Sequence, residues 1–247
     1  MAAAAASNLK RVTLELGGKS PLVVFNDADI TKAAEIAHAA AFANGGQCCV
    51  AGTRTYVQSA IYDKFVRRAT ELAQRRSVGN PYDDVDQGPQ VDQEMFDKVM
   101  SYIACGKAEG ARCVAGGARV GDSGYYIAPT VFADVQDGMK IAKEEIFGPV
   151  QSILKFETFD EVVDRANDTT YGLGAGVVTN DISLALAFVK HARVGSVWIN
   201  TYDYVTSQTP FGGYKNSGIG RELGEEGILP YLETKTVTIS LPKKLPA

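Results

Sequence analysis

The sequence is poor in the residues that build metal centres and disulfide frameworks. Its 247 residues include four cysteines and two histidines, and no Cys-x-x-Cys pair occurs. Since zinc ligands occur at short regular spacings, we predict no metal site. Cys48 and Cys49 are adjacent and bridge only with strain, so a disulfide scaffold is not expected. This cysteine usage favours the cytoplasm, with the mitochondrial matrix as the alternative.

The chain also lacks an excess of basic charge and a long apolar run. It has 25 Lys+Arg against 29 Asp+Glu, a formal net charge of −4. Nucleic-acid binders normally carry a basic stripe, so no nucleic-acid partner is expected. No run of eighteen apolar residues occurs, which predicts no membrane span. What the chain does have is 45% hydrophobic residues, enough to bury the core of one large or two small domains.

Strand-like and helix-like segments alternate along most of the chain. This order predicts an α/β fold with an open, mostly parallel sheet and helices on both faces. The strands are expected at residues 12–16, 21–25, 54–58, 112–115, 130–135, 150–156, 175–179 and 196–200. The helices are expected at residues 30–44, 59–74, 92–106, 160–167 and 183–191.

The two ends of the chain differ from this pattern. Residues 233–241, ETKTVTISL, alternate as an edge strand does, with no partner nearby in the sequence. Such a strand often pairs outside its own domain, which predicts a homo-oligomer, a dimer or tetramer, formed through it. The alanine run at residues 2–6 has neither the charged flank of a signal peptide nor the arginines of a transit peptide.

Two motifs contain groups suited to nucleophilic catalysis. In GGQCCVAG, residues 45–52, a helix is expected to end and a thiol to follow among small residues. That setting suits a nucleophile, although buried free cysteines are commonly just part of the core. In LELGGKSP, residues 14–21, Glu15 is expected at a strand end, where sites of α/β folds form. The alternatives for Glu15 are a general base and a salt-bridge partner.

Two further segments place polar and aromatic residues at element junctions. In EEIFGPV, residues 144–150, Glu145 is followed two residues later by Phe147. The segment from Asn200 to Gly213 is a loop with several aromatic residues. A plain helix-to-strand connection and a surface loop are the alternatives here. The GGKS of residues 17–20 is not a phosphate loop, because Thr13 stands where the leading glycine belongs.

Taken together and in this order, four segments resemble the catalytic half of an NAD(P)-dependent aldehyde dehydrogenase. They are LELGGKSP, FANGGQCCVAGTR, EEIFGPV and PFGGYKNSGIGRELG. The resemblance extends from about residue 7 to residue 241 and is strongest to the tetrameric retinal-type and mitochondrial-type branches. It implies oxidation of a small-molecule aldehyde to a carboxylic acid, with NAD as cofactor.

The resemblance also assigns roles to individual residues. Cys49 matches the nucleophile that forms a thiohemiacetal and then a thioester, and Glu15 matches the base that activates water to hydrolyse it. Glu145, Phe147 and, more weakly, Gly17 and Lys98 match residues at the cofactor. The residues that match the wall of the substrate tunnel are Cys48, Asp203, Val205 and Phe211.

Near the C-terminus the resemblance implies a proton acceptor and a subunit contact. Glu222 matches an acceptor that lies behind the catalytic groups, and the alternative is a glutamate at a helix start. Arg221 and Glu233 are expected to pair, because the terminal strand of such enzymes folds back beside the GRELG segment.

Members of this family are about twice as long as this chain. We therefore expect residues 1–17 to be the remnant of a dinucleotide-binding domain, residues 18–215 a catalytic domain, and residues 216–247 a return segment with the oligomerisation strand. Most of the cofactor domain is then absent from a truncated chain. The alternative function is a non-catalytic fragment or isoform that acts as an interaction or structural module.

Overall fold

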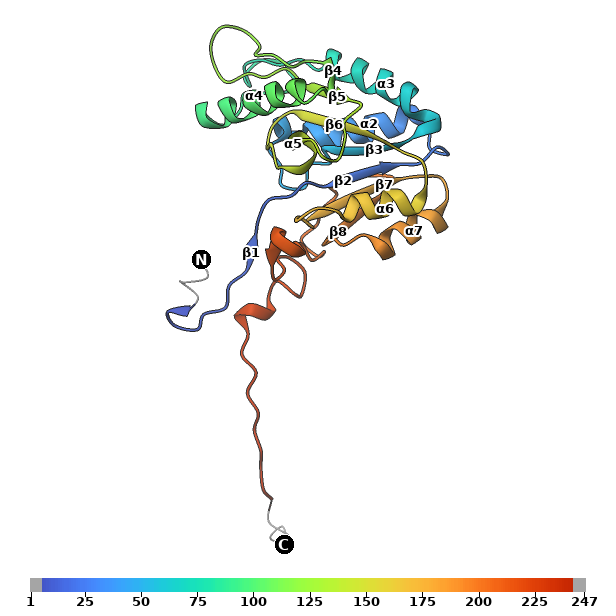
Figure 1. Ribbon diagram of the computed structural model, residues 1–247. Helices are drawn as coiled ribbons and strands as arrows, with labels where there is room; N and C mark the ends of the chain where they lie inside the picture. The colour runs from blue at the N-terminus through green and yellow to red at the C-terminus, as the bar shows by residue number, and fades with distance from the viewer. Residues whose placement is uncertain (1–5, 242–247) are drawn as a thin grey trace.

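The computed structural model describes residues 6–241 and is built on a seven-stranded sheet in the order β4-β5-β6-β3-β2-β7-β8 (Figure 1). Each neighbouring pair runs parallel except β4 and β5, which are antiparallel. The strands are β2 (Pro21–Val24), β3 (Arg54–Gln58), β4 (Arg112–Ala115), β5 (Thr130–Ala133), β6 (Val150–Phe156), β7 (Gly174–Val178) and β8 (Ser196–Ile199). The predicted open, mostly parallel sheet is confirmed.

Helices α2, α4, α6 and α7 begin where the sequence supplies capping side chains. Asp29, Asp92 and Asp181 each accept a hydrogen bond from a backbone N–H of the first turn that follows. Thr158 and Glu161 form a reciprocal capping box. The helices are α2 (Ile30–Phe42), α3 (Tyr62–Arg75), α4 (Gln93–Ala108), α5 (Lys140–Lys143), α6 (Phe159–Asn167) and α7 (Ile182–His191). Short 3₁₀ turns are η1 (Ala43–Gly46), η2 (Ser59–Ile61), η3 (Lys215–Ser217) and η4 (Leu229–Tyr231).

The sheet separates two apolar cores. Side chains alternate along β2, so that Leu22 and Val24 face α2 and α3 while Val23 faces the core that contains α4 to α7. Both β3 and β6 divide in the same way, with Val57 and Ile153 on the first side and Tyr56 and Leu154 on the second. The helices therefore cover both faces of the sheet, as predicted.

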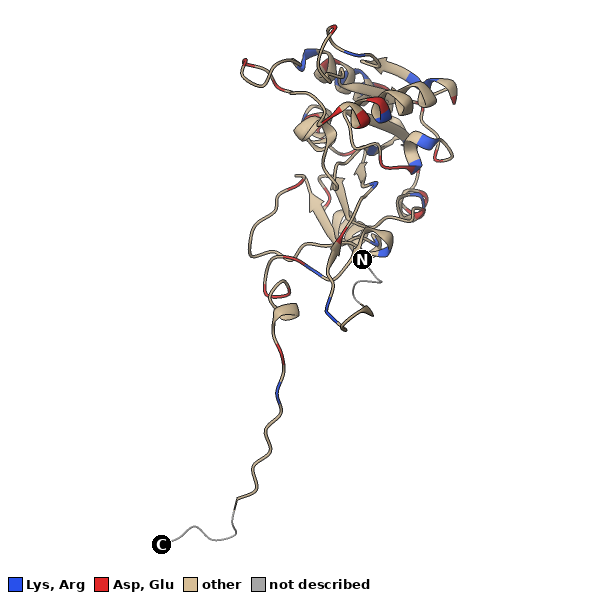
Figure 2. Cartoon of the chain, turned by 90° about the vertical axis from the view of Figure 1, so that its left-hand side faces the viewer, with Lys and Arg blue, Asp and Glu red and all other residues tan. Residues whose placement is uncertain are grey.

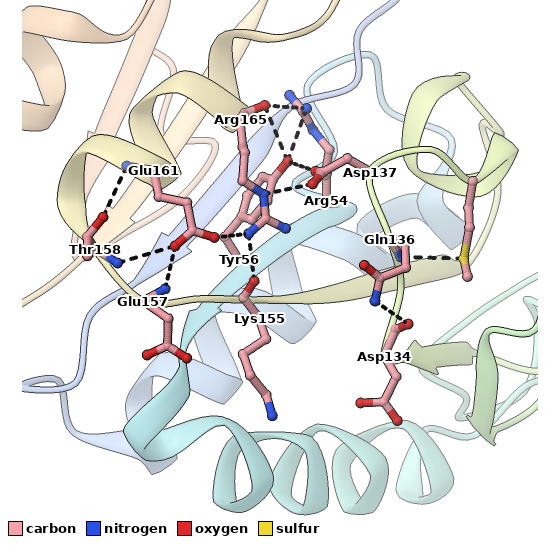
Figure 3. A network of polar contacts seen from close by, with 11 residues as sticks. Arg54, Tyr56, Asp134, Gln136, Asp137, Lys155, Glu157, Thr158, Glu161 and Arg165 are labelled. Carbon is pink, nitrogen blue, oxygen red and sulfur yellow. Dashed lines mark hydrogen bonds and ion pairs between the residues drawn. The ribbon is translucent and has the colours of Figure 1, made fainter.

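A polar network on the second face connects β3 to the end of α6 (Figure 3). Arg54, only 3% exposed, donates to the carbonyl oxygens of Arg165 and Ala166 at 3.2 and 2.8 Å. The Tyr56 hydroxyl donates to Asp137 at 2.7 Å, and the same carboxylate pairs with Arg165 at 2.7 Å. A buried guanidinium thus caps the negative end of a helix, where its charge is favourable.

Residues 12–16 do not join the main sheet. Only β1 (Leu14–Glu15) forms, and it pairs antiparallel with β9 (Gly218–Ile219) in a separate two-stranded ladder. This pairing joins the start of the described chain to the segment after η3. The predicted five-residue strand is therefore shorter than expected.

The structure assigns no strand to residues 233–241, and the pairing of this segment with another subunit stays a prediction. The segment leaves the body as an exposed extended tail with no ladder in the described part of the chain (Figure 1). A strand needs a neighbour to satisfy its backbone groups, and no described segment lies alongside. Residues 2–5 of the alanine run and 242–247 lie outside the described residues, and Ala6 is exposed.

The predicted Arg221–Glu233 pair is also wrong. Glu233 pairs instead with Arg11 at 2.9 Å, and Arg11 also donates to the carbonyl oxygens of Leu229 and Leu232 around η4. Arg221 points elsewhere and donates to Gly213 and Gly220. The η4 turn brings Glu233 to Arg11, a contact between the two ends of the chain that sequence spacing did not reveal.

The distribution of charged residues and the length of the helices are two further features of the fold. Acidic and basic residues are mixed along the same helices (Figure 2). Among residues 6–241, no helix is long and apolar enough to cross a bilayer.

Tyr56→Phe should lower the free energy of unfolding by about 2 kcal/mol, because it deletes a buried hydroxyl that donates to a carboxylate. Urea denaturation followed by circular dichroism measures this change. Tyr82→Phe is the control, since Tyr82 is 98% exposed and should lose nothing. Equal midpoints for the two variants would contradict the stabilising role of the network.

Candidate active site

Three of the motif segments lie immediately before neighbouring strands. Residues 15–20 lead into β2, residues 47–53 into β3 and residues 144–149 into β6. Because β6, β3 and β2 are adjacent and parallel, their amino-terminal ends meet at one edge of the sheet. The fold therefore brings together segments that are far apart in the sequence.

Three glycines, which have no side chain, allow these segments to approach closely. A Cβ at Gly18 would lie 2.4 Å from the carbonyl oxygen of Cys49, and one at Gly46 would lie 2.1 Å from that of Gly148. A Cβ at Gly17 would lie 2.2 Å from Oε2 of Glu145. Since real Cβ atoms do not approach backbone atoms so closely, only glycine fits at positions 18 and 46, whereas the contact at Gly17 is with the end of a flexible side chain.

The thiols follow a left-handed turn. After α2, residues Asn44, Gly45 and Gly46 have φ of +51°, +63° and +73°. Glycine adopts such φ values without cost, and asparagine tolerates them better than most residues. Helix α2 is consequently stopped, and the chain turns toward the loop with Cys48 and Cys49.

Cys49 and Glu15 lie together, as the sequence predicted. The carboxylate of Glu15 interacts with the Cys49 thiol, which also contacts the Cys48 thiol. Contact with Cys48, then burial, then the negative charge of Glu15 together raise the pKa of the Cys49 thiol well above its ordinary value. Oε1 of Glu15 is buried and has no hydrogen-bond partner among the described residues. That oxygen is free to accept a proton from the thiol.

Glu145 and Phe147 form the second part of the site. The backbone N–H of Gly18 donates to Oε1 of Glu145 at 3.1 Å. Burial raises the pKa of Glu145, opposed by this hydrogen bond and by the charges of Lys98 and Lys19. Phe147 has φ of +60°, which is uncommon for a bulky residue and marks a strained position. Lys98 from α4 lies within electrostatic reach of Glu145, and its place at the cofactor stays a prediction.

An apolar wall lies on the other side of the thiols. Cys48 and Cys49 pack against a small cluster to which Phe211 also belongs. The buried members of this cluster are Val50, Leu173 and Trp198. Asp203 accepts a hydrogen bond from the Cys48 thiol at 3.8 Å, and burial raises the pKa of this carboxylate. Of the four residues predicted for the substrate wall, three gather here.

Val205 and Glu222 are not packed into this group. Val205 is 43% exposed. The backbone of Glu222 exchanges two hydrogen bonds of 2.7 Å with Phe211, while its side chain is exposed. No helix begins at Glu222, so the helix-start interpretation of this residue is wrong.

Sequence reasoning missed two residues beside the site. Trp198 in β8 packs its ring 4.8 Å from that of Tyr202, and it is the only tryptophan in the chain. Lys19 is 2% exposed, and burial followed by the charge of Arg54 lowers its pKa to about 7. Its position directly after Gly17 and Gly18 is the sequence signal for this residue.

A cavity of about 790 Å³ lies away from the thiols and contains none of the predicted site residues. Its lining includes Asp164, His191, Arg193 and Lys215. Within residues 6–241, no cluster of three potential metal ligands occurs. The sulfur, the two carboxylates and the apolar wall therefore identify the candidate active site, whereas cavity size alone would not.

Comparison with known proteins gives consistent results. The sequence profile of the aldehyde dehydrogenase family matches residues 1–237. The chain is 58% identical over 243 residues to "Aldehyde dehydrogenase, mitochondrial" of Homo sapiens, covering 98% of this chain and 47% of that protein. It is 55% identical to "Retinal dehydrogenase 2" of Gallus gallus, with 98% and 47% coverage.

Solved structures show the same fold. An NAD⁺ complex of aldehyde dehydrogenase from Bacillus cereus superposes with a TM-score of 0.94 at 43% identity, covering 96% of this chain and 49% of that one. An NAD-dependent aldehyde dehydrogenase from Sinorhizobium meliloti gives 0.95 at 42% identity, with 99% and 49% coverage. The chain thus spans about half the length of the proteins it resembles.

Gly18→Ala should lower the free energy of unfolding by more than about 2 kcal/mol, because its methyl group would collide with the backbone of Cys49. Gly138→Ala is the matched control, since a Cβ there meets nothing within 4 Å. Thermal unfolding of both variants tests the contact. An equal effect at both positions would show that the two segments are not tightly apposed.

Glu15→Gln should lower the pKa of Cys49, because it removes a negative charge that disfavours the thiolate. The pH profile of iodoacetamide alkylation reports this pKa, since only the thiolate reacts. The variants are made in a protein that also carries Cys48→Ala. Cys49 is then the one thiol in the peptide whose alkylation is measured by mass spectrometry. The midpoint should fall in Glu15→Gln and stay constant in Glu222→Gln; an unchanged midpoint in both would place Glu15 away from the sulfur.

Proposed function

This chain belongs to the aldehyde dehydrogenase family, and we propose that it carries the residues that oxidise an aldehyde to a carboxylic acid with NAD. The observation that supports this most directly is the convergence of Cys49, Glu15 and Glu145 from three separate segments. A nucleophile, a base and a cofactor-binding carboxylate are the groups that this reaction requires. The chain corresponds, in this proposal, to the catalytic half of such an enzyme.

The first step is activation of the thiol. A thiol with a raised pKa beside a carboxylate is a weak nucleophile until it loses its proton, and Oε1 of Glu15 has a free acceptor position. Cys49 passes its proton to Glu15 and attacks the aldehyde carbon, giving a thiohemiacetal on its sulfur. The backbone N–H of Cys49 stabilises the oxyanion that develops.

Glu145, Phe147 and Gly17 fit the nicotinamide ribose. Oε1 of Glu145 is held by Gly18, while Oε2 lies beside Gly17, where the lack of a side chain keeps space open. A carboxylate oxygen at such a place accepts hydrogen bonds from ribose hydroxyls. NAD bound there would supply the hydride acceptor for oxidation of the thiohemiacetal to a thioester. Residues 1–17 would contribute the remnant of the dinucleotide-binding domain.

The second half of the reaction is hydrolysis. Glu15 first passes the proton that it took from Cys49 on to Glu222 and so regains its carboxylate. It then deprotonates the water that attacks the thioester on Cys49. Carboxylic acid is released and the thiol is restored. Glu222, behind Phe211, receives the proton from the catalytic groups in this proposal, and it supports the base rather than touching substrate.

The substrate meets the wall formed around Cys48, Phe211 and Asp203, with Val205 at its exposed rim. An apolar surface with one carboxylate suits a small-molecule aldehyde with an apolar body. This wall belongs to the proposed catalytic domain, residues 18–215.

Assembly and location follow from the exposed tail and from the relatives. Residues 216–247 form the proposed return and oligomerisation segment, because residues 233–241 alternate in polarity and stay unpaired in one copy. Pairing with another subunit would satisfy their backbone groups and give a homodimer or tetramer. The names of several mitochondrial relatives support the mitochondrial matrix as the compartment, although the cytoplasm remains the expectation from cysteine usage.

Acylation by an activated acetyl ester tests the roles of sulfur and base without cofactor. The acetyl group should appear on Cys49, and Glu15→Gln should slow its hydrolysis about 100-fold or more, so that acetyl-enzyme accumulates in intact-mass spectra. Cys49→Ser should not acylate, and Cys113→Ser should behave as the parent. Acetyl groups on Cys105 or Cys113 alone would overturn the assignment.

Calorimetric titration with NAD separates the enzyme from the alternative, an interaction module that retains the motifs without the activity. If the parent protein releases heat on binding NAD and Glu145→Leu does not, the result supports the proposed cofactor site. Absence of binding together with absence of Cys49 acylation would favour the non-catalytic module.

A further inference from the structure

The side-chain amides of Gln90 and Gln47 donate hydrogen bonds to the left-handed turn that precedes the two thiols. We propose that Gln90 is a positioning residue for Cys49. The inference rests on the proposed function, because it assigns Gln90 a role through the nucleophile. Gln90 itself touches neither Cys49 nor Glu15 through any hydrogen bond, and it acts on the turn.

The turn needs external support. Three consecutive residues, Asn44 to Gly46, have positive φ. The two glycines adopt this conformation freely, so Asn44 is the residue that must be held in it. For Asn44 this backbone conformation costs of order 1 kcal/mol. A turn of this kind persists only when its surroundings over-determine it, so the groups that bond to it decide where the next residues point.

Gln90 supplies one such bond from a separate loop. It is 1% exposed, and its Nε2 donates to the carbonyl oxygen of Gly45 at 3.3 Å. Its own backbone N–H donates to Tyr125 at 2.9 Å, which fixes the loop from which the side chain extends. A Cβ at Gly45 would lie only 3.1 Å from Nε2, so the amide packs directly on the turn.

Gln47, which lies at the end of the turn, forms hydrogen bonds both to the turn and to the loop of Gln90. Its Nε2 donates to the carbonyl oxygen of Asn44 at 3.1 Å, and its Oε1 accepts from the backbone N–H of Val91 at 2.9 Å. Two hydrogen bonds therefore connect the loop to the turn, one from the side chain of Gln90 to Gly45 and one from the backbone of Val91 to Gln47. Since Cys48 directly follows Gln47, the position of the thiols depends on these two amides.

Loss of the Gln90 amide leaves the buried carbonyl of Gly45 without a donor. The turn then relaxes toward ordinary backbone values, and the thiol loop moves with it. Cys49 faces the Cys48 thiol on its own loop and the Glu15 carboxylate on β1, and Asp203 lies beyond Cys48. Separation from Glu15 removes one of the causes that raise the pKa of Cys49, so its proton leaves more readily while transfer to Glu15 fails.

Gln90→Met tests the proposal, because methionine preserves size and apolar packing but cannot donate. Two readouts should move in opposite directions. Iodoacetamide alkylation of Cys49 at pH 8 should become about five- to tenfold faster, and deacylation of acetyl-Cys49 should become at least about tenfold slower, for a displacement of order 1 kcal/mol. A purely structural role would lower thermal stability without this opposed pair of changes.

Gln87→Met is the matched control. Gln87 is 3% exposed in the same loop, but its amide donates to Ile127 and accepts from Arg76, without a hydrogen bond to the turn. It should lose comparable thermal stability and keep both rates. Equal rate changes in Gln87→Met and Gln90→Met, or unchanged rates in Gln90→Met, would overturn the proposal.

Gln47→Met covers the case in which Gln90→Met does not fold. Gln47 is half-buried, and its replacement removes the reciprocal bond to Val91, so it should shift both rates in the same directions. If the parent protein shows no deacylation, the proposed function fails. The alkylation profile still decides whether Gln90 positions the thiol.

Discussion

The site depends on close backbone contact at two glycines. Gly18 lies against the carbonyl oxygen of Cys49 and Gly46 against that of Gly148, at distances that leave no room for a Cβ. Gly17 lies against the carboxylate of Glu145, the end of a flexible side chain. These contacts help to hold the Cys49 sulfur and the carboxylates of Glu15 and Glu145 in one region.

The position of the site on the sheet follows from topology. Ligands in open parallel sheets commonly bind beyond the carboxyl ends of the strands. Here the three motif loops come before β2, β3 and β6, and so they meet at the amino-terminal edge. The residues that complete the site come from the end of β8 and the loop beyond it, where Trp198 and Asp203 lie.

At this end of the sheet, groups that become negative on losing a proton lie close together and disfavour each other's ionisation. A thiol and two carboxylates lie within interaction distance, which disfavours a second negative charge beside the first. Lys19 and Lys98 lie close enough to Glu145 to offset part of that cost. Proton transfer from Cys49 to Glu15 moves negative charge between the two groups without adding any, which is why this pair suits thiol activation.

The sequence alone determined the fold class, because alternating apolar periodicities and aspartate caps are local properties. It also placed Cys49 beside Glu15, through motifs whose order matched a known family. Only the tertiary structure revealed the contacts that depend on distant segments: Arg11 with Glu233, the buried Lys19, the ring of Trp198 and the amide of Gln90 on the thiol turn. Residues 233–241 form no strand in one copy, since alternation gives a segment the capacity to pair, whereas pairing requires a neighbour in space.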